Sequence, residues 1–391
     1  MHKLTETTPF FHQPSRPQPE PPRVISDLLA DVGLSINGNQ PWDIQIYDEK
    51  VYRMILYKGS LGFGVAYMEG LWEAEQLDET FHRLLSADLD RKLKGWARVR
   101  LLTEAVRHRI FNLQSQERAF TVAHKHYDIG NDVFEAMLDS TMSYSCAYWE
   151  HADNLEQAQQ HKLDMICRKL ALKPGEHLLE IGCGWGGFAQ YAAETIGARV
   201  TGVTISQAQH DYAVERMKRL GLDDRVEIVM MDYRDIKGQF DAVVSIEMFE
   251  AVGESYWGTY FTKLHDVLKK GGKAGLQIIT IADEMFEDYR SRADFIQKYV
   301  FPGGMLPSAQ KLLEQTQAAG LKAVSSFRFG GDYAETLKQW GQRFEDAWKE
   351  GRIKGFDAHF RKLWLFYLAY CEAGFRTQRT NVVHLELQRA D

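Results

Sequence analysis

The chain has 391 residues, of which 45% are hydrophobic and 26% charged, and its formal net charge is -7. This length allows one large hydrophobic core and a second, smaller domain. The negative balance argues against bulk binding of nucleic acid. The longest apolar run, Leu363 to Cys371, is too short to span a bilayer. The first residues contain no apolar signal core, so we expect the protein to stay in the cytoplasm.

The N-terminal part of the sequence divides into two expected segments. Residues 1–23 are rich in proline and poor in apolar residues, which predicts a flexible leader. Residues 24–115 are expected to form a small N-terminal domain, in which Gly59 to Gly70 is too glycine-rich for a plain helix. Its expected elements are a strand or hairpin over Ile44–Leu56 and helices over Leu71–Leu85 and Leu93–Phe111.

Residues 116–391 form the expected larger domain, in which strand and helix patterns alternate. The expected strands are His177–Ile181, Ala198–Val203, Val226–Asp232, Phe240–Ile246, Lys273–Ile281, Leu321–Phe329 and Val382–Gln388. The expected helices run over 153–172, 186–196, 206–220 and 256–268. This alternation predicts an α/β fold with a parallel sheet that is covered by helices on both faces, and the last two strands complete its edge. An aromatic insertion over 283–307 and a helical insertion over 333–375 are expected within this domain.

The glycine-rich segment Glu180–Gly187 is the most informative motif. An expected strand leads into it and an expected helix leads out, which is where an α/β sheet binds a nucleotide-like ligand. Its glycines let the backbone approach a ligand without a Cβ in the way. A dinucleotide fingerprint would require an acid about 20 residues later, but the next strand ends in Thr204. With its leading Glu180, the segment instead resembles the E-x-G-x-G-x-G form of S-adenosylmethionine-dependent methyltransferases.

Polar residues follow four of the expected strands at their carboxyl ends, where ligands bind in such sheets. They are the glycine turn, Thr204 with Gln209, Asp232 with Tyr233, and the segment Glu247–Gly253. A carboxylate in an otherwise apolar cleft is costly to bury without a partner. We therefore expect Glu250, in the last of these segments, to be functional rather than a structural cap or part of a surface ion pair.

An ordered set of short motifs carries a wider resemblance over residues 121 to 391. The motifs are His126–Asp132, Tyr144–Trp149, Glu180–Gly187, Gly202–Ser206, Asp232–Asp235, Phe301–Gly304, Leu306–Ser308 and Gly331–Tyr333. In this order they resemble the cyclopropane-fatty-acid synthases, a family that includes mycolic-acid cyclopropane synthases and related methyltransferases of unsaturated acyl chains. The resemblance implies a class I methyltransferase fold with a Rossmann-like, seven-stranded sheet and helical insertions.

The resemblance also implies two sets of ligand-binding residues. The positions that hold S-adenosylmethionine match Tyr144, Ser145, Gly182, Gly184, Thr204, Gln209, Asp232 and Tyr233. Family members bind a bicarbonate ion beside the reacting carbons, and its surroundings match Cys146 through the backbone amide, Glu250, Ile279 and Tyr333. Cys371 matches a cysteine once assigned as catalytic, but a thiol nucleophile has no obvious task here, so we expect Cys371 to be structural.

Two positions depart from the best-known bacterial pattern. Ala251 stands where that pattern has the His of E-H-V-G, and Gln277 stands where it has a His that contacts bicarbonate. Both changes resemble plant-type and some actinobacterial members. An amide can donate a hydrogen bond to an anion, but it cannot take up a proton as His can.

The implied substrate, an unsaturated acyl chain in a phospholipid, requires a dry site. Methyl transfer to an alkene leaves a carbocation that water would trap, whereas aromatic faces stabilise it. The aromatic segments Phe286–Phe301 and Trp364–Phe375 are candidates for this lining, although most of their side chains are expected to be ordinary core. Bicarbonate, oriented by Glu250 and Tyr333, is expected to remove the proton that closes the ring.

A phospholipid substrate also implies contact with a membrane surface. Basic and apolar residues interleave from Arg91 to Phe111, which suits a helix on anionic lipid and equally a solvated helix packed on its own domain. A second candidate is Arg361–Tyr370, which contains Trp364 and Phe366. We expect peripheral association with the inner face of the membrane, and dimerisation through the small domain stays open.

Three alternatives for the function stay open. The same methyl transfer can end in a methylene- or methyl-branched fatty acid. Some plant alkaloid N-methyltransferases share the scaffold, although Phe301–Ser308, Glu250 and Tyr333 disfavour an amine substrate. A non-catalytic membrane-binding protein could keep the fold, but the complete set of donor-site residues argues against it.

Overall fold

The computed structural model describes residues 21, 23–87 and 130–390. The chain divides into two compact units, Met1–Ala87 and Asp88–Asp391. Most of the expected leader, the expected helix Leu93–Phe111 and the expected domain boundary at residues 115 and 116 lie outside the described residues.

The first unit has a small aromatic core. Its described helices are α1 (Arg23–Ala30), α2 (Lys50–Met68) and α3 (Leu77–Ser86), and its strands β1 (Gln45–Ile46) and β2 (Trp72–Glu73) pair antiparallel. Trp72 is buried, stacks on Phe63 with 4.0 Å between ring centroids, and meets Phe81 edge-on. These contacts give the unit its own packing centre.

Two expectations for the first unit were wrong in part. The strand expected over Ile44–Leu56 is limited to β1, because α2 already begins at Lys50. The helix expected from Leu71 begins only at Leu77, because the residues before it pair with β1. Gly59 has a φ of 57° and interrupts α2, but the helix resumes after it and continues through Gly62 and Gly64 to Met68. The expectation that this stretch is too glycine-rich for a plain helix therefore holds only at Gly59.

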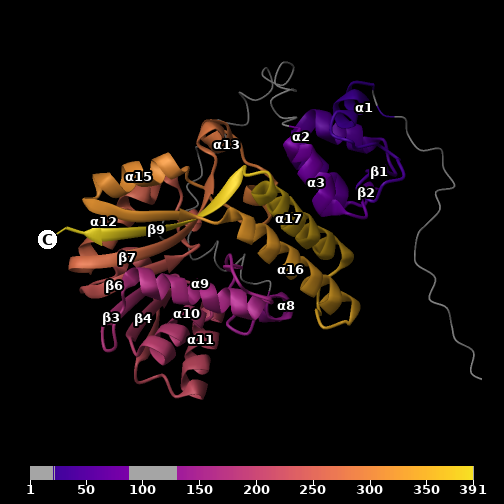
Figure 1. The fold of residues 1–391 in the computed structure, drawn as a ribbon. Helices are drawn as coiled ribbons and strands as arrows, with labels where there is room; N and C mark the ends of the chain where they lie inside the picture. Colours follow the sequence, from indigo (N-terminus) through magenta and orange to yellow (C-terminus); the bar gives the residue numbers. More distant parts are fainter. Residues whose placement is uncertain (1–20, 22, 88–129, 391) are drawn as a thin grey trace, which may run out of the picture. The chain divides into compact units, whose positions relative to one another are not determined.

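A seven-stranded sheet forms the centre of the second unit (Figure 1). Its spatial order is β5 (Val226–Met230), β4 (Arg199–Thr204), β3 (His177–Ile181), β6 (Phe240–Ile246), β7 (Leu268–Ile281), β9 (Thr380–Arg389) and β8 (Leu321–Arg328). The first five strands are parallel, whereas β9 runs antiparallel to β7 and β8. The expected α/β fold is confirmed. The sheet is mixed rather than parallel, because a pair of helices between β8 and β9 brings the chain back to the edge where β8 ends, and β9 then runs in the opposite direction.

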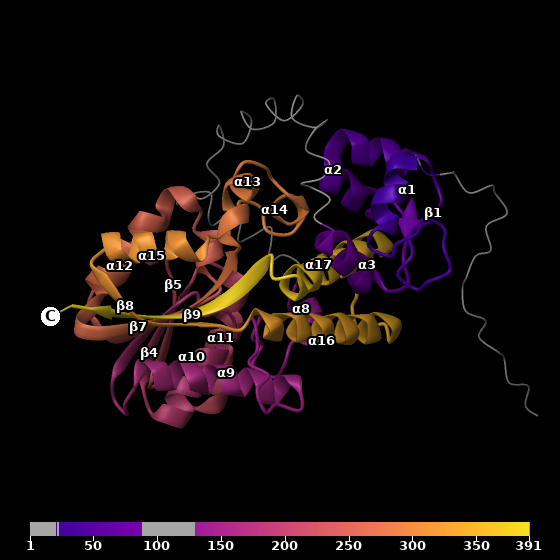
Figure 2. The same ribbon diagram turned by 45° about the horizontal axis from the view of Figure 1, so that its top comes forward.

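Helices cover both faces of this sheet (Figure 2). One face carries α9 (Leu155–Leu170), α10 (Gly187–Tyr191), the π turn Ala192–Ile196 and α11 (Gln207–Leu220). The other carries α12 (Trp257–Val267) and α15 (Ala309–Ala318). Each face has its own cluster of buried apolar residues, so the sheet separates two hydrophobic layers.

Side-chain caps fix where several of these helices begin. Asn154 caps α9, Ser206 caps α11 and Ser308 caps α15, each by accepting a backbone N–H three residues later. The cap of α9 was expected at Asp153, one residue earlier. Ser206 follows the end of β4 closely, and Ser308 pairs with Ile281 at the end of β7, so both caps lie at the carboxyl ends of strands.

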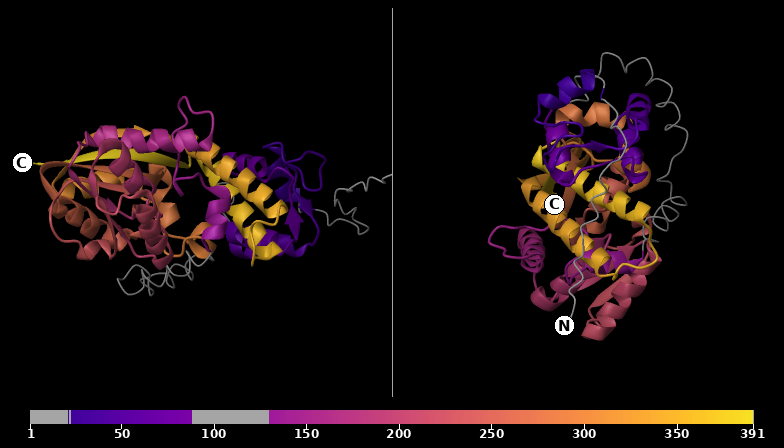
Figure 3. Two further views of the ribbon diagram at one scale, coloured as in Figure 1. Left: turned by 90° about the horizontal axis from the view of Figure 1, so that it is seen from below. Right: turned by 90° about the vertical axis from the view of Figure 1, so that its right-hand side faces the viewer.

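The expected helical insertion is a pair of long helices, α16 (Gly330–Lys349) and α17 (Ala358–Arg376), between β8 and β9. Figure 3 shows the two helices side by side. Trp364 and Phe366 are only 1% and 2% exposed, and Phe366 packs on Phe295 with 4.3 Å between ring centroids. The second membrane candidate was therefore wrong, because its aromatic residues belong to the core.

Three shorter helices complete the carboxyl edge of the sheet. They are α8 (Asn131–Met137), which precedes the site loop, and α13 (Phe286–Arg290) and α14 (Phe295–Tyr299), which lie in the expected aromatic insertion. Every helix among the described residues is too short or too polar to cross a membrane.

Candidate active site

The glycine turn between β3 and α10 leaves room for a ligand. Gly182 and Gly184 have φ values of 82° and 52°, which side-chain-bearing residues rarely adopt. A Cβ at Gly182 would lie 2.6 Å from Cγ of Met248, whereas a Cβ at Gly184 would meet no described residue within 4 Å. The turn therefore packs tightly against the segment after β6 and has open space beside Gly184.

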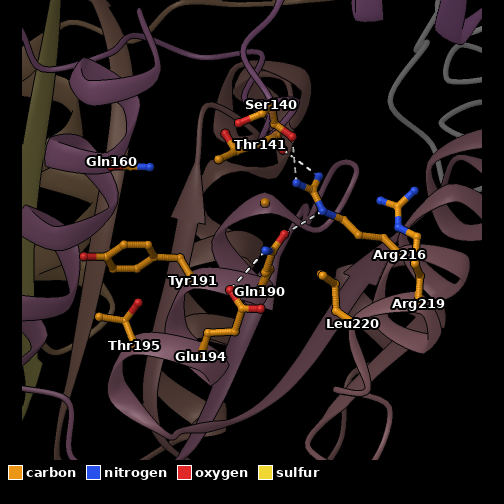
Figure 4. A pocket seen from close by; sticks show the side chains of 11 residues that line it. Ser140, Thr141, Gln160, Gln190, Tyr191, Glu194, Thr195, Arg216, Arg219 and Leu220 are labelled. Atoms are coloured by element: carbon orange, nitrogen blue, oxygen red, sulfur yellow. Dashed lines mark hydrogen bonds between the residues drawn. The ribbon is translucent and has the colours of Figure 1, made fainter.

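Arg216 ties α10, the helix that follows this turn, to the segment before Tyr144 (Figure 4). Its guanidinium donates to the carbonyl oxygens of Ser140 and Thr141, both at 2.8 Å, and to Oε1 of Gln190 at 2.7 Å. Arg216 is 6% exposed, and a charge so deeply buried requires partners of this kind. These contacts lie beside a pocket of about 450 Å³ and position the loop that carries Tyr144. Sequence reasoning missed Arg216, since its partners are distant in the chain.

The other predicted donor-site residues follow the neighbouring strands β4 and β5. Thr204 donates from Oγ1 to Oε1 of Gln209 at 2.8 Å, which fixes this amide at the start of α11. Asp232 accepts from the guanidinium of Arg234 at 2.8 and 2.6 Å, so its negative charge is compensated locally. The parallel register brings these residues, with Tyr233, to the same sheet edge as the glycine turn. Their contact with a methyl donor stays a prediction.

Tyr144 and Ser145 are held by side chains from distant helices. The hydroxyl oxygens of Tyr144 and Tyr367 lie 2.8 Å apart, and Lys162 donates to Oγ of Ser145 at 2.8 Å. Lys162 is 1% exposed; burial lowers its pKa, while the charge of Glu247 opposes this shift. Sequence reasoning missed Lys162, because a lysine in a helix is ordinarily solvated.

The carboxylate of Glu247, directly after β6, lies in a cage of donors. Oε1 accepts from the backbone nitrogen of Cys146 at 2.9 Å and from Nε2 of Gln277 at 2.7 Å. Oε2 accepts from the hydroxyl of Tyr333 at 2.5 Å. Burial raises the pKa of Glu247 above its ordinary value, and the hydrogen bonds from these three donors, with the charge of Lys162, offset only part of that rise. Three predicted site residues thus converge on a carboxylate to which sequence reasoning assigned no role.

The amide of Gln277 is held in one orientation by further hydrogen bonds. Nε2 of His384 lies 2.6 Å from Oε1 of Gln277, and Nδ1 of His384 lies 3.3 Å from Nζ of Lys169. Because an ammonium group only donates, the network assigns the proton of a neutral His384 to Nε2. Burial, and then the charge of Lys169, lower the pKa of His384 well below its ordinary value. Gln277 therefore presents its NH2 group to Glu247.

Glu250 is in a different protonation state from Glu247. The backbone nitrogen of Ile279 donates to Oε1 of Glu250 at 2.5 Å, whereas Oε2 is buried without a hydrogen-bond partner among the described residues. Burial, and then the charge of Glu247, raise the pKa of Glu250 to about 8. With a pKa of about 8, Glu250 is mostly protonated at neutral pH, whereas the three donors around Glu247 favour its ionised form. Neighbouring carboxyl groups that differ in protonation are typical of acid–base sites.

Aromatic side chains lie around the tyrosines of the site. Tyr144 lies 5.2 Å from Trp340 and 6.4 Å from Phe301 between ring centroids. Tyr333 stacks on Phe375 at 4.5 Å. Phe301 and Phe375 come from the two aromatic segments predicted as lining, so part of each segment reaches the site.

Cys371 makes none of these contacts. Burial and the nearby charge of Asp294 raise the pKa of its thiol well above the ordinary value. A protonated thiol is a poor nucleophile. A structural role for Cys371 stays our expectation.

The donors that the resemblance assigns to bicarbonate are engaged by carboxyl groups of the protein. Cys146, Gln277 and Tyr333 donate to Glu247, and Ile279 donates to Glu250. A second small anion at this position would have to displace Glu247 and would be repelled by it. The residues as they stand therefore do not fit bicarbonate.

The fold and the site together define a class of protein. A glycine turn after the interior strand β3, in a seven-stranded sheet in which β9 runs antiparallel, is the architecture of class I S-adenosylmethionine-dependent methyltransferases.

Comparison with known proteins narrows this class. Residues 114–385 match the family model of mycolic acid cyclopropane synthetase. The chain is 42% identical to the cyclopropane-fatty-acyl-phospholipid synthase of Escherichia coli (strain K12), over 91% of this chain and 90% of that protein. It is 38% identical to tuberculostearic acid methyltransferase UfaA1 of Mycobacterium tuberculosis, over 86% and 81% of the two chains. The chain belongs to the mycolic acid cyclopropane synthetase family.

A solved structure supports the same assignment. The mycolic acid cyclopropane synthase CmaA1, complexed with SAH and CTAB, aligns with a TM-score of 0.64 and 29% sequence identity. The alignment covers 69% of this chain and 98% of that chain.

Proposed function

We propose that this protein transfers the methyl carbon of S-adenosylmethionine to the cis double bond of unsaturated phospholipid acyl chains and closes a cyclopropane ring. One observation carries the proposal: the donor-binding glycine turn packs directly against the segment that bears Glu247 and Glu250, through Gly182 and Met248. The identity to the phospholipid enzyme of Escherichia coli supports the same class of substrate.

The residues of the turn fit a sulfonium donor. The space beside Gly184 accommodates a ligand along the backbone, and Thr204 fixes Gln209 at the same edge. The donor supplies an electrophilic methyl group. The protein holds that group in line with the alkene and excludes water from it.

The lining of the site suits a positive charge on hydrocarbon. When the methyl group joins one alkene carbon, the other carbon becomes a carbocation. The ring faces of Tyr144, Tyr333 and Trp340 stabilise a cation. The ionised Glu247 adds a negative charge, while the protonated Glu250 avoids a second one.

Incubation with oleoyl phospholipid vesicles and methyl-labelled donor tests the proposal. We expect labelled acyl chains whose NMR spectrum contains cyclopropane ring protons. The Gly182→Ala variant is the control for donor-dependent labelling, since its added Cβ collides with Met248. If the protein binds the donor in calorimetry and labels no acyl chain, the proposal is wrong.

A methylene- or methyl-branched fatty acid is the second candidate product. The 38% identity to a tuberculostearic acid methyltransferase favours it. The methylene-branched chain is an isomer of the cyclopropane chain, so NMR rather than mass must separate them. Vinylidene protons in place of ring protons would identify the branched product, and labelling of an added amine would identify an N-methyltransferase.

Access to a lipid surface is part of the proposal. We propose that the basic segment from Arg91 to Phe111, which lies outside the described residues, associates with anionic lipid at the inner face of the membrane. The whole chain has a net charge of -7, which anionic lipid repels, so the attraction must come from a local basic segment. Dimerisation through the small domain stays a prediction.

A further inference from the structure

We propose that Glu247 is the catalytic base of this protein and replaces the bicarbonate ion expected from the resemblance. The inference rests on the proposed function, because the base acts on a carbocation formed on an acyl chain. It deepens that function by assigning the proton acceptor to the polypeptide itself.

Among the described residues, the hydrogen bonds of Glu247 leave one acceptor position for a substrate proton. A carboxylate has about four acceptor positions. Cys146 and Gln277 occupy the two on Oε1, and Tyr333 occupies one on Oε2. The remaining lone pair on Oε2 is the available acceptor. An oxyanion held by an N–H, an amide and a phenol is chemically equivalent to a bound bicarbonate oxyanion, but it cannot dissociate.

The backbone supports a functional reason for this side chain. Glu247 has a φ of 49°, in the left-handed region, which costs a side-chain-bearing residue about 1 kcal/mol. The backbone nitrogen of Glu247 donates to the carbonyl oxygen of Gln277 at 2.8 Å, which fixes this conformation to β7. Backbone strain of this kind persists where the surrounding structure holds it, commonly at functional sites.

Hydrogen bonds and one nearby positive charge favour the ionised form of Glu247 and oppose the effect of its burial. Lys162 approaches from α9, and Tyr333 donates from α16. Cys146 contributes a neutral thiol, because burial raises the pKa of that thiol well above its ordinary value. Glu250 is protonated at neutral pH. The site therefore presents one negative charge to the cation.

The proposed step balances. The S–CH3 bond of the donor breaks and a C–C bond forms, which leaves S-adenosylhomocysteine and a carbocation on the acyl chain. A C–H bond of the new methyl group then breaks. Its electron pair closes the second ring bond, and its proton goes to Oε2 of Glu247, which returns it to solvent after the product leaves.

The orientation of Gln277 fits this assignment. His384 holds the amide so that its NH2 group faces Glu247. An amide donor is independent of pH, whereas a histidine at this position could compete with the base for a proton. The glutamine at position 277, where the bacterial pattern has histidine, is therefore suited to hold the carboxylate at position 247.

The test uses the full chain with oleoyl phospholipid vesicles, in buffer depleted of carbon dioxide and in buffer with added bicarbonate. We expect the unchanged protein to turn over equally in both. Glu247→Gly should lose about 100-fold in turnover and recover part of it with bicarbonate or formate, which can enter the vacated cage. Glu247→Gln fills the cage without a base, so it should lose a similar factor without recovery. Glu254→Gln, in an exposed residue of the same loop, is the control.

A binding measurement gives a second readout. With S-adenosylhomocysteine present, 13C-labelled bicarbonate should show NMR line broadening with Glu247→Gly and none with the unchanged protein. The proposal is overturned if the unchanged protein binds bicarbonate or requires it, or if Glu247→Gln keeps full turnover. If Glu247→Gly does not fold, the other two comparisons still decide. No acyl product under any condition would instead contradict the proposed function.

Discussion

The hydroxyl group of Tyr333 donates a hydrogen bond of 2.5 Å to Oε2 of Glu247, although the two residues are 86 positions apart in the sequence. Tyr333 lies near the start of α16, and Glu247 follows β6. The same first turn of α16 holds the loop of Cys146, because Asp332 accepts from the backbone nitrogen of Trp149 at 2.8 Å. The helical insertion is therefore part of the site and not an appendage of the sheet.

Replacing Tyr333 by Phe should change the pH dependence of turnover. The hydroxyl stabilises the ionised form of Glu247 and so lowers its pKa. Without it, the acidic limb of the kcat profile should move to higher pH by about one to two units, which corresponds to a hydrogen bond to a charged group. The ring stacking on Phe375 is retained, so thermal unfolding should change little. A profile that keeps its position would show that Glu247 does not titrate in the reaction.

Gly182→Ala should strongly weaken binding of the methyl donor. The added Cβ lies 2.6 Å from Met248, in a residue with a φ of 82°. We expect the Kd for S-adenosylmethionine, measured by calorimetry, to rise by about two orders of magnitude. Gly175→Ala is the matched control, because the φ of Gly175 is 81° and an added Cβ there would meet no residue of the described chain within 4 Å. It should cost about 1 kcal/mol of stability and leave the Kd unchanged. Equal losses of affinity in both variants would refute the steric explanation.

Glu250→Gln should stabilise the protein increasingly as the pH rises. The folded pKa of Glu250 is about 8, above its unfolded value, so the folded state binds more protons between these two values. In the unchanged protein, the contribution of Glu250 to the free energy of unfolding is fully present at low pH and is lost as the pH rises toward 8. The difference in unfolding free energy between Glu250→Gln and the unchanged protein should grow by at most about 1.4 kcal/mol per pH unit and then level off above pH 8. Urea unfolding from pH 5 to 9 measures it. Glu180, with a pKa also near 8, is common to both proteins. A pH-independent difference would contradict the assigned protonation state.

Cys371→Ala should keep turnover within about a factor of two. The raised pKa leaves the thiol protonated, and the proposed step has no place for a sulfur nucleophile. Some loss of stability, about 1 kcal/mol, is expected from the removed sulfur. Cys167→Ala, a buried thiol in the cluster under the other face of the sheet, serves as the comparison. A large and selective loss of kcat in Cys371→Ala would restore a catalytic role.

Replacing Arg98, Arg100 and Arg107 by Glu should weaken association with vesicles that contain anionic lipid. Each basic residue near such a surface contributes about 1 kcal/mol, so sedimentation with vesicles should fall strongly and depend on salt. The control changes three exposed basic residues of the second unit to Glu, namely Lys218, Arg219 and Lys237. Equal sedimentation of both variants would remove the segment Arg91–Phe111 from the membrane contact.

The order of elements in the second unit follows from local sequence patterns. The expected β3 and β6 agree with the structure at both ends, because buried parallel strands are short apolar runs bounded by turn residues. The first unit was harder to predict. There, strands of two residues are too short to show an alternating pattern, and α2 forms although its glycines have a low helix propensity.

The sequence by itself determined the family and the glycine turn, and it identified Glu250, Gln277 and Tyr333 as candidate site residues. All of these depend on residue types in a fixed order along the chain. Only the tertiary structure decided what they contact. Glu247 accepts hydrogen bonds from the loop before α9, from β7 and from α16. Lys162 acts on the same carboxylate through its charge, and His384 acts indirectly, through the hydrogen bond that orients Gln277. Burial and neighbouring charges set the protonation state of these carboxyl groups. Both depend on residues that are distant in the sequence, so the residue type at a titrating position does not reveal them.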